Sequence, residues 1–276
     1  MDVFGSGVGM GSDGIIEKLV ARGRSNWEKP AGPVNFTPIP EADQLINDLD
    51  GHAHHFVLAC LMDRQIEAER AWSIPYRLGE RAGSWEFDGL EALSFEDVAH
   101  HMSEPDALHW LWKDMAAYFF KGLKKIKVDY GGVASNIWTG SPSSATLVRR
   151  FLEFDGAGPK IATMAANILV NGFRLPVSDR FSIDISADRQ VQRVFARLGL
   201  ARENASPEEV VYRAREMNPE YPGLIDFAVW ELGRETCRPK QPVCDKCFLG
   251  SLCPRVGVGF PRPEQIGERQ QARRSW

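Results

Sequence analysis

Four of the five cysteines in this 276-residue chain lie within one short segment. The segment reads CRPKQPVCDKCFLGSLC, with the spacing C-x6-C-x2-C-x5-C, and its thiols belong to Cys237, Cys244, Cys247 and Cys253. Structural zinc sites usually combine two closely spaced ligand pairs, whereas this segment has one such pair between two longer gaps. Four thiolates are the usual ligands of a 4Fe-4S cluster. The spacing therefore favours a 4Fe-4S cluster, with a zinc ion and a disulfide pair as the alternatives.

Basic residues are concentrated in and after this segment. The whole chain has a formal net charge of −4, but residues 238–276 contain eight Lys or Arg and three Asp or Glu. We expect residues 269–276 to be a solvated tail. Arg238, Lys240 and Lys246 lie inside the cysteine loop, where ligand bonds would hold the backbone in place, and a fixed basic loop is suited to contact phosphates. These three residues are candidates for nucleic-acid contact.

A second informative segment, residues 151–172, reads FLEFDGAGPKIATMAANILVNG. Two apolar stretches are separated by Gly156-Ala157-Gly158, and Pro159 falls in the first turn of the second stretch. Glycines permit a tight reversal and leave backbone N–H groups uncovered, and the following helix adds its positive N-terminal dipole. The arrangement predicts an anion cradle suited to a phosphate, although the motif by itself is also typical of an ordinary turn between helices.

Lys160 follows at once, near the N-terminus of the second predicted helix. A helix N-terminus favours anions, so partial burial there would lower the pKa of the lysine and free its amine as a nucleophile. The local sequence also fits an ordinary solvated lysine. Both interpretations stand at this point.

Asp188 precedes a stretch whose apolar residues have helical spacing, which makes it a natural N-cap. Capping alone would explain an aspartate at this position. A carboxylate held at a helix N-terminus also stays ionised, and it could stabilise positive charge on a sugar or polarise a nucleophile. Asp188 is therefore a candidate catalytic residue as well as a cap.

The elements that must position these residues are helical. From His52 onward nearly every periodic segment has helical spacing, with no clear alternating strand and no internal repeat, so the sequence predicts an all-α protein. Helices are expected over residues 15–21 and 40–49, and residues 128–144, rich in Gly, Ser and Pro, are expected to be mostly loop. The first 14 residues are predicted to be disordered.

Three neighbouring histidines, His52, His54 and His55, raise the question of a metal site. They precede an expected helix and lack a partner cluster. We therefore expect them to cap or solvate the start of the helix.

The composition is that of an ordinary globular protein, with 43% hydrophobic and 25% charged residues. The N-terminal segment has no signal-peptide pattern, and no later run reaches the ~20 apolar residues that span a bilayer. We expect a cytoplasmic protein associated with the nucleoid. A reducing compartment also suits thiolates that bind a metal cluster.

Taken together, these motifs resemble endonuclease III, the iron–sulfur branch of the helix-hairpin-helix DNA glycosylases. The resemblance includes the hairpin with Lys160, the segment from Asp188 to Val194, the stretch AVWELGRETC and the terminal cysteine loop. It is strong over residues 151–254, moderate over about 41–150 and absent before that. No single motif would suffice, but their order and chemistry agree.

The resemblance implies a six-helix barrel domain and an iron–sulfur cluster domain that flank a DNA-binding cleft. Residues 52–175 would form the barrel, with the helix-hairpin-helix at about 147–172, and residues 15–51 and 176–276 would form the cluster domain. The target nucleotide would be flipped out of the duplex. Gln65 falls where the family carries the residue that fills the vacated space, although it also reads as a surface glutamine.

The resemblance also implies the chemistry. In bifunctional members a lysine, which corresponds to Lys160, attacks C1′ of the sugar. An aspartate, which corresponds to Asp188, stabilises the cationic transition state. The Schiff base that forms then leads to β-elimination. The expected enzyme is thus a DNA glycosylase with AP-lyase activity that acts as a monomer. Its expected partner is double-stranded DNA that contains a damaged base or an abasic site. The default damaged base of the family is an oxidised pyrimidine. The alternatives are a monofunctional uracil or mismatch glycosylase in which Asp188 activates water, and a non-catalytic module that binds damaged DNA.

The chain departs from the family pattern in one segment. Between Lys160 and Asp188 lie several more residues than usual, with the excess in FRLPVSDRFSIDIS. This insertion would lie near the flipped base, and it adds Asp179 and Asp184, the second of which could take the role of Asp188. We expect no extra domain after the cysteine loop, and this expectation argues against the adenine-removing branch of the family.

Overall fold

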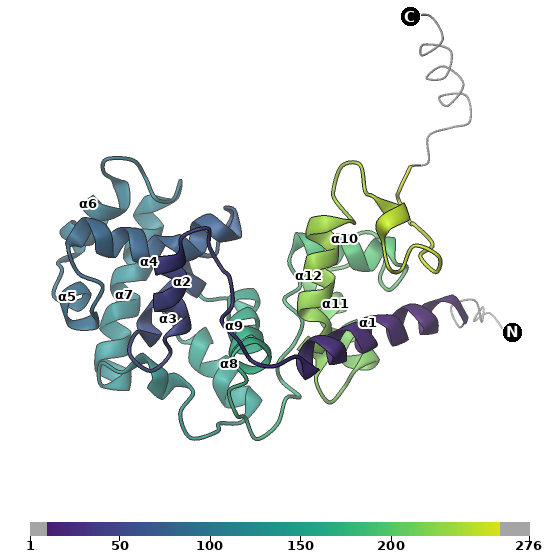
Figure 1. Ribbon diagram of the computed structural model, residues 1–276, viewed down its shortest axis with the longest axis horizontal. Helices are drawn as coiled ribbons and strands as arrows, with labels where there is room; N and C mark the ends of the chain where they lie inside the picture. Colours follow the sequence, from purple (N-terminus) through teal and green to yellow (C-terminus); the bar gives the residue numbers. More distant parts are fainter. Residues whose placement is uncertain (1–9, 260–276) are drawn as a thin grey trace, which may run out of the picture.

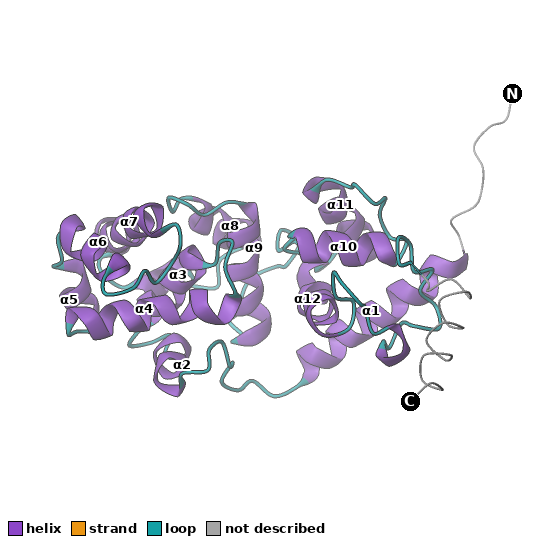
Figure 2. Cartoon of the chain, turned by 90° about the horizontal axis from the view of Figure 1, so that it is seen from above, coloured by secondary structure: helices purple, strands orange, loops and turns teal. Residues whose placement is uncertain are grey.

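The computed structural model describes residues 10–259, and the regular secondary structure of this range is helical throughout. Two lobes lie side by side along the long axis of the molecule (Figures 1 and 2). Each lobe surrounds its own hydrophobic core. No helix among residues 10–259 combines the length and the apolar character needed to cross a bilayer. The all-α prediction is confirmed.

The first lobe is built around α3, a helix with ten buried residues that packs against α2, α4, α7 and α9. A helix that is apolar on every side must be enclosed by others. The helical elements of this lobe are α2 (Pro40–Asn47), α3 (Ala53–Met62), α4 (Ala68–Ala82), α5 (Phe87–Glu91), α6 (Phe95–Ser103), α7 (Trp112–Tyr130), a 3₁₀ turn (Ala134–Ile137), α8 (Ser144–Leu152), α9 (Pro159–Asn167) and a π turn (Ile168–Gly172).

The second lobe brings the start of the described chain against its end. Ile15 and Leu19 of the first helix are buried in one core with Val194, Phe195 and Val229, and Figure 1 shows this helix beneath the C-terminal helices. The elements of this lobe are α1 (Met10–Glu28), α10 (Arg189–Arg197), α11 (Pro207–Met217), a 3₁₀ turn (Pro222–Ile225), α12 (Asp226–Glu235) and a short 3₁₀ turn (Cys244–Lys246).

Several predicted boundaries were wrong. Residues 10–14 are helical rather than disordered, because α1 is longer than the predicted helix at 15–21 and its apolar face is held by the second core. The predicted loop at 128–144 begins late, since α7 continues to Tyr130 and ends only at Gly131, whose φ is 65°. Residues 1–9 of the expected disordered N-terminus and the expected tail at 269–276 lie outside the described residues.

The two cores support a division of the chain into two domains, which stays a proposal. The sequence-based division placed residues 15–51 with the cysteine loop. In the structure α2 packs against α3 and α4, and Ile46 belongs to the first core. We therefore propose that α2 is part of the first domain and that α1 alone joins the second from the N-terminal side.

The histidines at the start of α3 are enclosed. His54 and His55 are 3% and 0% exposed, and the Nε2 atom of each lies 2.9 Å from the carbonyl oxygen of Trp85. His52 pairs instead with Asp48, at 2.7 Å. The expectation of a solvated helix start was wrong for His54 and His55, because α3 is covered on all sides from its first turn.

Acid should destabilise this arrangement. Burial lowers the pKa of His55 from 6.5 to about 3, and it also lowers the pKa of His54. Between these two pKa values His55 is protonated in the unfolded chain but neutral in the folded protein. The free energy of unfolding should therefore fall as the pH decreases from 6.5, by up to about 1.4 kcal/mol per pH unit for this group. Urea denaturation between pH 7.5 and 5 measures the slope.

The variant His55→Leu isolates this contribution, because His54 still donates to Trp85. Its free energy of unfolding should depend less steeply on pH between 6.5 and 5 than that of the wild type. Equal slopes for the two proteins would show that His55 takes up its proton in the folded state.

Candidate functional site

The predicted hairpin is present between α8 and α9. Gly156 adopts a left-handed conformation with φ of 86°, and a Cβ atom there would lie 2.8 Å from the ring of Tyr118. The carbonyl oxygen of Gly156 accepts a hydrogen bond from the guanidinium of Arg64. Gly158 is the N-cap of α9, in an extended conformation with open space where a side chain would project. The turn therefore requires glycine at 156, while Gly158 leaves the backbone uncovered.

Lys160 is the second residue of α9, and it is neither free nor fully solvated. Its Nζ atom lies 2.9 Å from Oδ2 of Asp63 and 3.4 Å from the carbonyl oxygen of the same residue. The two side chains are 35% and 12% exposed, respectively. Asp63 is the C-cap of α3. Sequence reasoning missed this partner, since 97 residues separate the pair.

Asp188 caps α10 as the sequence predicts. Its Oδ1 atom accepts a hydrogen bond of 2.8 Å from the backbone N–H of Val191. The second carboxylate oxygen is not used by this cap. A role for Asp188 in catalysis stays a prediction.

A further carboxylate, that of Asp226 at the start of α12, lies in the same neighbourhood. It accepts hydrogen bonds from the backbone N–H of Ser186 at 2.6 Å and from its hydroxyl at 3.2 Å. The pKa of Asp226 is raised to about 6, chiefly by burial and to a smaller degree by the negative charge of Asp188, while the hydrogen bonds from Ser186 and the charge of Lys160 act to lower it. The three groups therefore interact electrostatically. An acidic residue in the first turn of a helix was the only sequence signal for Asp226, and capping chemistry explains that signal equally well.

The two acidic residues of the insertion have other partners. Asp184 is 8% exposed and forms a bidentate ion pair with Arg215, at 2.7 and 2.8 Å. Asp179 accepts a hydrogen bond from the hydroxyl of Ser144. Because both oxygens of Asp184 are engaged by a guanidinium, this geometry favours Asp188 over Asp184 as the candidate catalytic aspartate.

The insertion packs at the junction of the two lobes. The guanidinium groups of Arg174 and Arg180 lie 4.7 and 4.8 Å from the ring centroid of Trp27 in α1. Further along, the carbonyl oxygen of Ile183 accepts a hydrogen bond from Gly223. The insertion thus links α1 to the turn before α12, and its end at Ser186 meets Asp226.

The predicted nucleic-acid contacts fall in two places. Gln65 is exposed, with φ of 55°, in the loop that follows α3, and its carbonyl oxygen accepts a hydrogen bond from the indole N–H of Trp110. Arg238, Lys240 and Lys246 are exposed on the cysteine loop of the other lobe. The structure therefore brings Gln65 near Lys160 through the adjoining Asp63, but it does not bring the basic loop to the hairpin.

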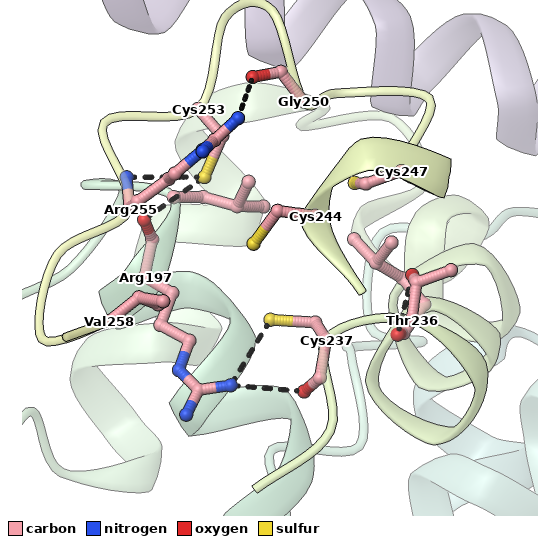
Figure 3. Close-up of a pocket in the computed structure, with 11 residues that line it drawn as sticks. Arg197, Thr236, Cys237, Cys244, Cys247, Gly250, Cys253, Arg255 and Val258 are labelled. Atoms are coloured by element: carbon pink, nitrogen blue, oxygen red, sulfur yellow. Dashed lines mark hydrogen bonds between the residues drawn. The ribbon is translucent and has the colours of Figure 1, made fainter. Parts of the chain in front are cut away.

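The four cysteines line one pocket, together with Arg197 and Arg255 (Figure 3). They are free thiols rather than disulfides. About 370 Å³ of space between the surrounding atoms, part of it open to solvent, lies in this pocket. Arg197 donates to the carbonyl oxygen of Cys237 at 3.3 Å and approaches its sulfur at 3.6 Å.

The donor chemistry of this pocket fits a group held by four thiolates. Burial raises the pKa of the Cys247 and Cys253 thiols, while the backbone N–H groups of Leu249 and Arg255 point to their sulfurs, both at 3.4 Å, and act in the opposite direction. In the part of the chain that the structure describes, no three His, Cys, Asp or Glu side chains are arranged to hold a single metal ion. The 4Fe-4S cluster stays a prediction.

Comparison with known proteins gives relatives of one kind. No family model matches the chain. The chain is 28% identical over 158 residues to endonuclease III of Thermotoga maritima, and this aligned region covers 55% of this chain and 64% of that protein. It is 26% identical over 145 residues to endonuclease III-like protein 1 of Gallus gallus, covering 52% and 45%. The matched region thus spans less than two thirds of either relative.

Solved structures agree at the level of the fold. A non-covalent endonuclease III–DNA complex and a trapped covalent endonuclease III–DNA intermediate superpose with TM-scores of 0.58 and 0.57, each at 18% identity over 94% of this chain and 98% of theirs. A thermostable thymine-DNA glycosylase superposes with a TM-score of 0.59 at 14% identity, over 89% and 96%. The chain has the helix-hairpin-helix glycosylase fold. The predicted resemblance to endonuclease III is confirmed by the two sequence relatives.

The two hairpin glycines should respond differently to substitution. Gly156→Ala places a side chain in a left-handed conformation and against Tyr118, so it should destabilise the fold by about 2 kcal/mol or more. Gly158→Ala meets no atom within 4 Å and should cost about 1 kcal/mol or less. Chemical denaturation of both variants tests this expectation, and equal losses would refute the requirement for glycine at 156.

Proposed function

We propose that this chain is a base-excision-repair DNA glycosylase with an associated AP-lyase activity. The observation that carries the proposal is the position of Lys160, whose amine lies in the first turn of the second hairpin helix beside Asp63 and within electrostatic range of Asp226. An amine so placed can serve as a nucleophile toward an electrophilic carbon of a substrate bound at the hairpin. The relatives named above support the same class of activity.

The proposed partner is double-stranded DNA with a damaged base or an abasic site. The uncovered backbone at Gly158 and the N-terminus of α9 suit a phosphate. Gln65 lies exposed in the adjacent loop, where it would fill the space left by a flipped nucleotide. Arg238, Lys240 and Lys246 add positive charge that would contact the backbone further along the duplex. We further propose that the protein acts as a monomer and associates with the nucleoid.

The proposed chemistry uses one amine and one carboxylate. Lys160 attacks C1′ of the flipped nucleotide as the base departs, and Asp188 stabilises the positive charge that develops on the sugar. The resulting Schiff base undergoes β-elimination, which nicks the strand. Oxidised pyrimidines are the proposed substrates. In the monofunctional alternative, water activated by Asp188 would replace Lys160.

We also propose that Cys237, Cys244, Cys247 and Cys253 hold a 4Fe-4S cluster. When bound, such a cluster supplies a rigid anchor for the loop between its ligands. Arg197 closes the pocket from α10, where it donates to the carbonyl oxygens of residues 237–239. This arrangement would fix the exposed basic residues of the loop.

Borohydride trapping on a duplex with an abasic site tests the lyase. The wild type should form a covalent adduct, and Lys160→Ala should form none. Asp188→Asn should reduce base release from an oxidised-pyrimidine duplex by at least about 100-fold. Asparagine also caps helices well, so unchanged thermal stability would separate this loss from unfolding.

The outcomes separate the three classes of function. Base release without an adduct, on uracil or mismatch duplexes, would identify the monofunctional enzyme. Binding of damaged DNA with neither reaction, and with full binding by Asp188→Asn, would identify a non-catalytic module. An adduct that persists in Lys160→Ala would refute the assignment of the nucleophile.

Metal analysis of purified protein tests the cluster. The wild type should contain about four irons per chain and absorb in the visible range, and Cys244→Ala should lose both. Cys60→Ala is the matched control, because Cys60 is a buried thiol of α3 outside the pocket, and it should keep both. About one zinc per chain, with no iron, would overturn the cluster in favour of a zinc site.

A further inference from the structure

We infer that Asp63 is a further catalytic residue, one that accepts the proton which Lys160 must lose before its amine can attack. The inference rests on the proposed function and adds a second carboxylate to it. Its starting point is the contact of 2.9 Å between Lys160 Nζ and Asp63 Oδ2. Asp188, by contrast, directs one oxygen to the N–H of Val191.

The backbone that carries Asp63 is fixed in place independently of the lysine. Asp63 ends α3, and the two residues that follow it are held by neighbouring segments. Arg64 donates to the carbonyl oxygen of Gly156 in the hairpin, and its own carbonyl oxygen accepts a hydrogen bond of 2.8 Å from His109. The carbonyl oxygen of Gln65 accepts one of 3.1 Å from Trp110. A side chain carried on backbone fixed in this way needs little reorganisation when charge moves.

The charges around the pair suit a transfer of this kind. At 12% exposure the Asp63 side chain is largely removed from water, while Lys160 at 35% can still be reached. Besides burial, which raises the pKa of the Cys60 thiol in α3, the charge of Asp63 raises that pKa and the charge of Lys160 lowers it. The charge of Lys160 also lowers the pKa of Asp226 in α12. Arg64 follows Asp63 in the chain and contacts Gly156 of the hairpin, and Asp226 of the second lobe interacts with both Lys160 and Asp188.

The step balances without any added reactant except water. The ammonium of Lys160 gives one proton to Asp63 Oδ2, and the electron pair of that N–H bond stays on nitrogen. This pair forms the bond to C1′ while the bond from C1′ to the base breaks, and its electrons leave with the base. The base then takes a proton from water, and Asp63 releases its proton to water. At an abasic site the same amine adds to the C1′ aldehyde. The oxygen of the adduct then takes one proton from nitrogen and one from Asp63 and leaves as water, which gives the protonated Schiff base.

The rate of borohydride trapping at an abasic site, measured from pH 6 to 10, tests the inference. Asp63→Asn keeps the size and a hydrogen-bond acceptor but cannot take the proton. Its trapping rate at pH 7 should fall on the order of 100-fold. The loss should shrink as the pH approaches 10, where a lysine amine begins to lose its proton unaided. Asp63→Glu should recover part of the rate at pH 7.

Two controls separate this role from a structural one. Asp129→Asn removes the carboxylate from another lysine–aspartate pair, with Lys125 on α7 at 2.6 Å, and it should trap like the wild type. Thermal denaturation and affinity for uncleaved abasic DNA should be unchanged in Asp63→Asn. Trapping by Asp63→Asn that equals the wild type, or a loss that is the same at every pH, would overturn the inference. Failure of the proposed function has a different signature, since the wild type itself would then form no adduct.

Discussion

The complete burial of α3 is the constraint on which the first lobe depends. Each of its ten residues is enclosed, so its neighbours must cover it on every side, and α2, α4, α7 and α9 do so. Polar residues can therefore follow or precede α3 only at the ends of the helix. Asp63, Arg64 and Gln65 follow one such end, where Asp63 contacts Lys160 and Arg64 contacts Gly156 of the hairpin. Packing of apolar side chains thus sets the position of the carboxylate that contacts Lys160.

The second lobe depends on a contact between segments far apart in the chain. The core formed by Ile15 and Leu19 with the residues of α10 and α12 closes a loop that contains the entire first lobe. Arg174 and Arg180, both stacked on Trp27, add a second tie between the lobes. The insertion is therefore more than a lengthened loop, because it fixes α1 relative to the segment that leads to Asp188.

Two carboxylates interact with one lysine, that of Asp63 by direct contact and that of Asp226 through its charge, and Asp188 acts in turn on Asp226. Such a concentration of negative charge is costly, and the structure offsets it by hydrogen bonds from Ser186 to Asp226 and from Val191 to Asp188, and by the ion pair of Asp63 with Lys160. The raised pKa of Asp226, about 6, reflects its burial first and the charge of Asp188 next. Groups whose ionisation is perturbed in this way are typical of functional sites.

Local sequence patterns predicted the features that depend on neighbouring residues: the helical periodicity, the glycine turn, the cap at Asp188 and the gathering of four cysteines in one loop. They could not determine contacts that join distant segments. Lys160 meets Asp63 across 97 residues, and Ser186 meets Asp226 across 40, so no local pattern records either pairing. The full length of α1 was missed for the same reason, since its apolar face has a partner only once the chain has folded. Local propensity acts between adjacent residues, whereas the packing of the core decides which remote side chains become neighbours.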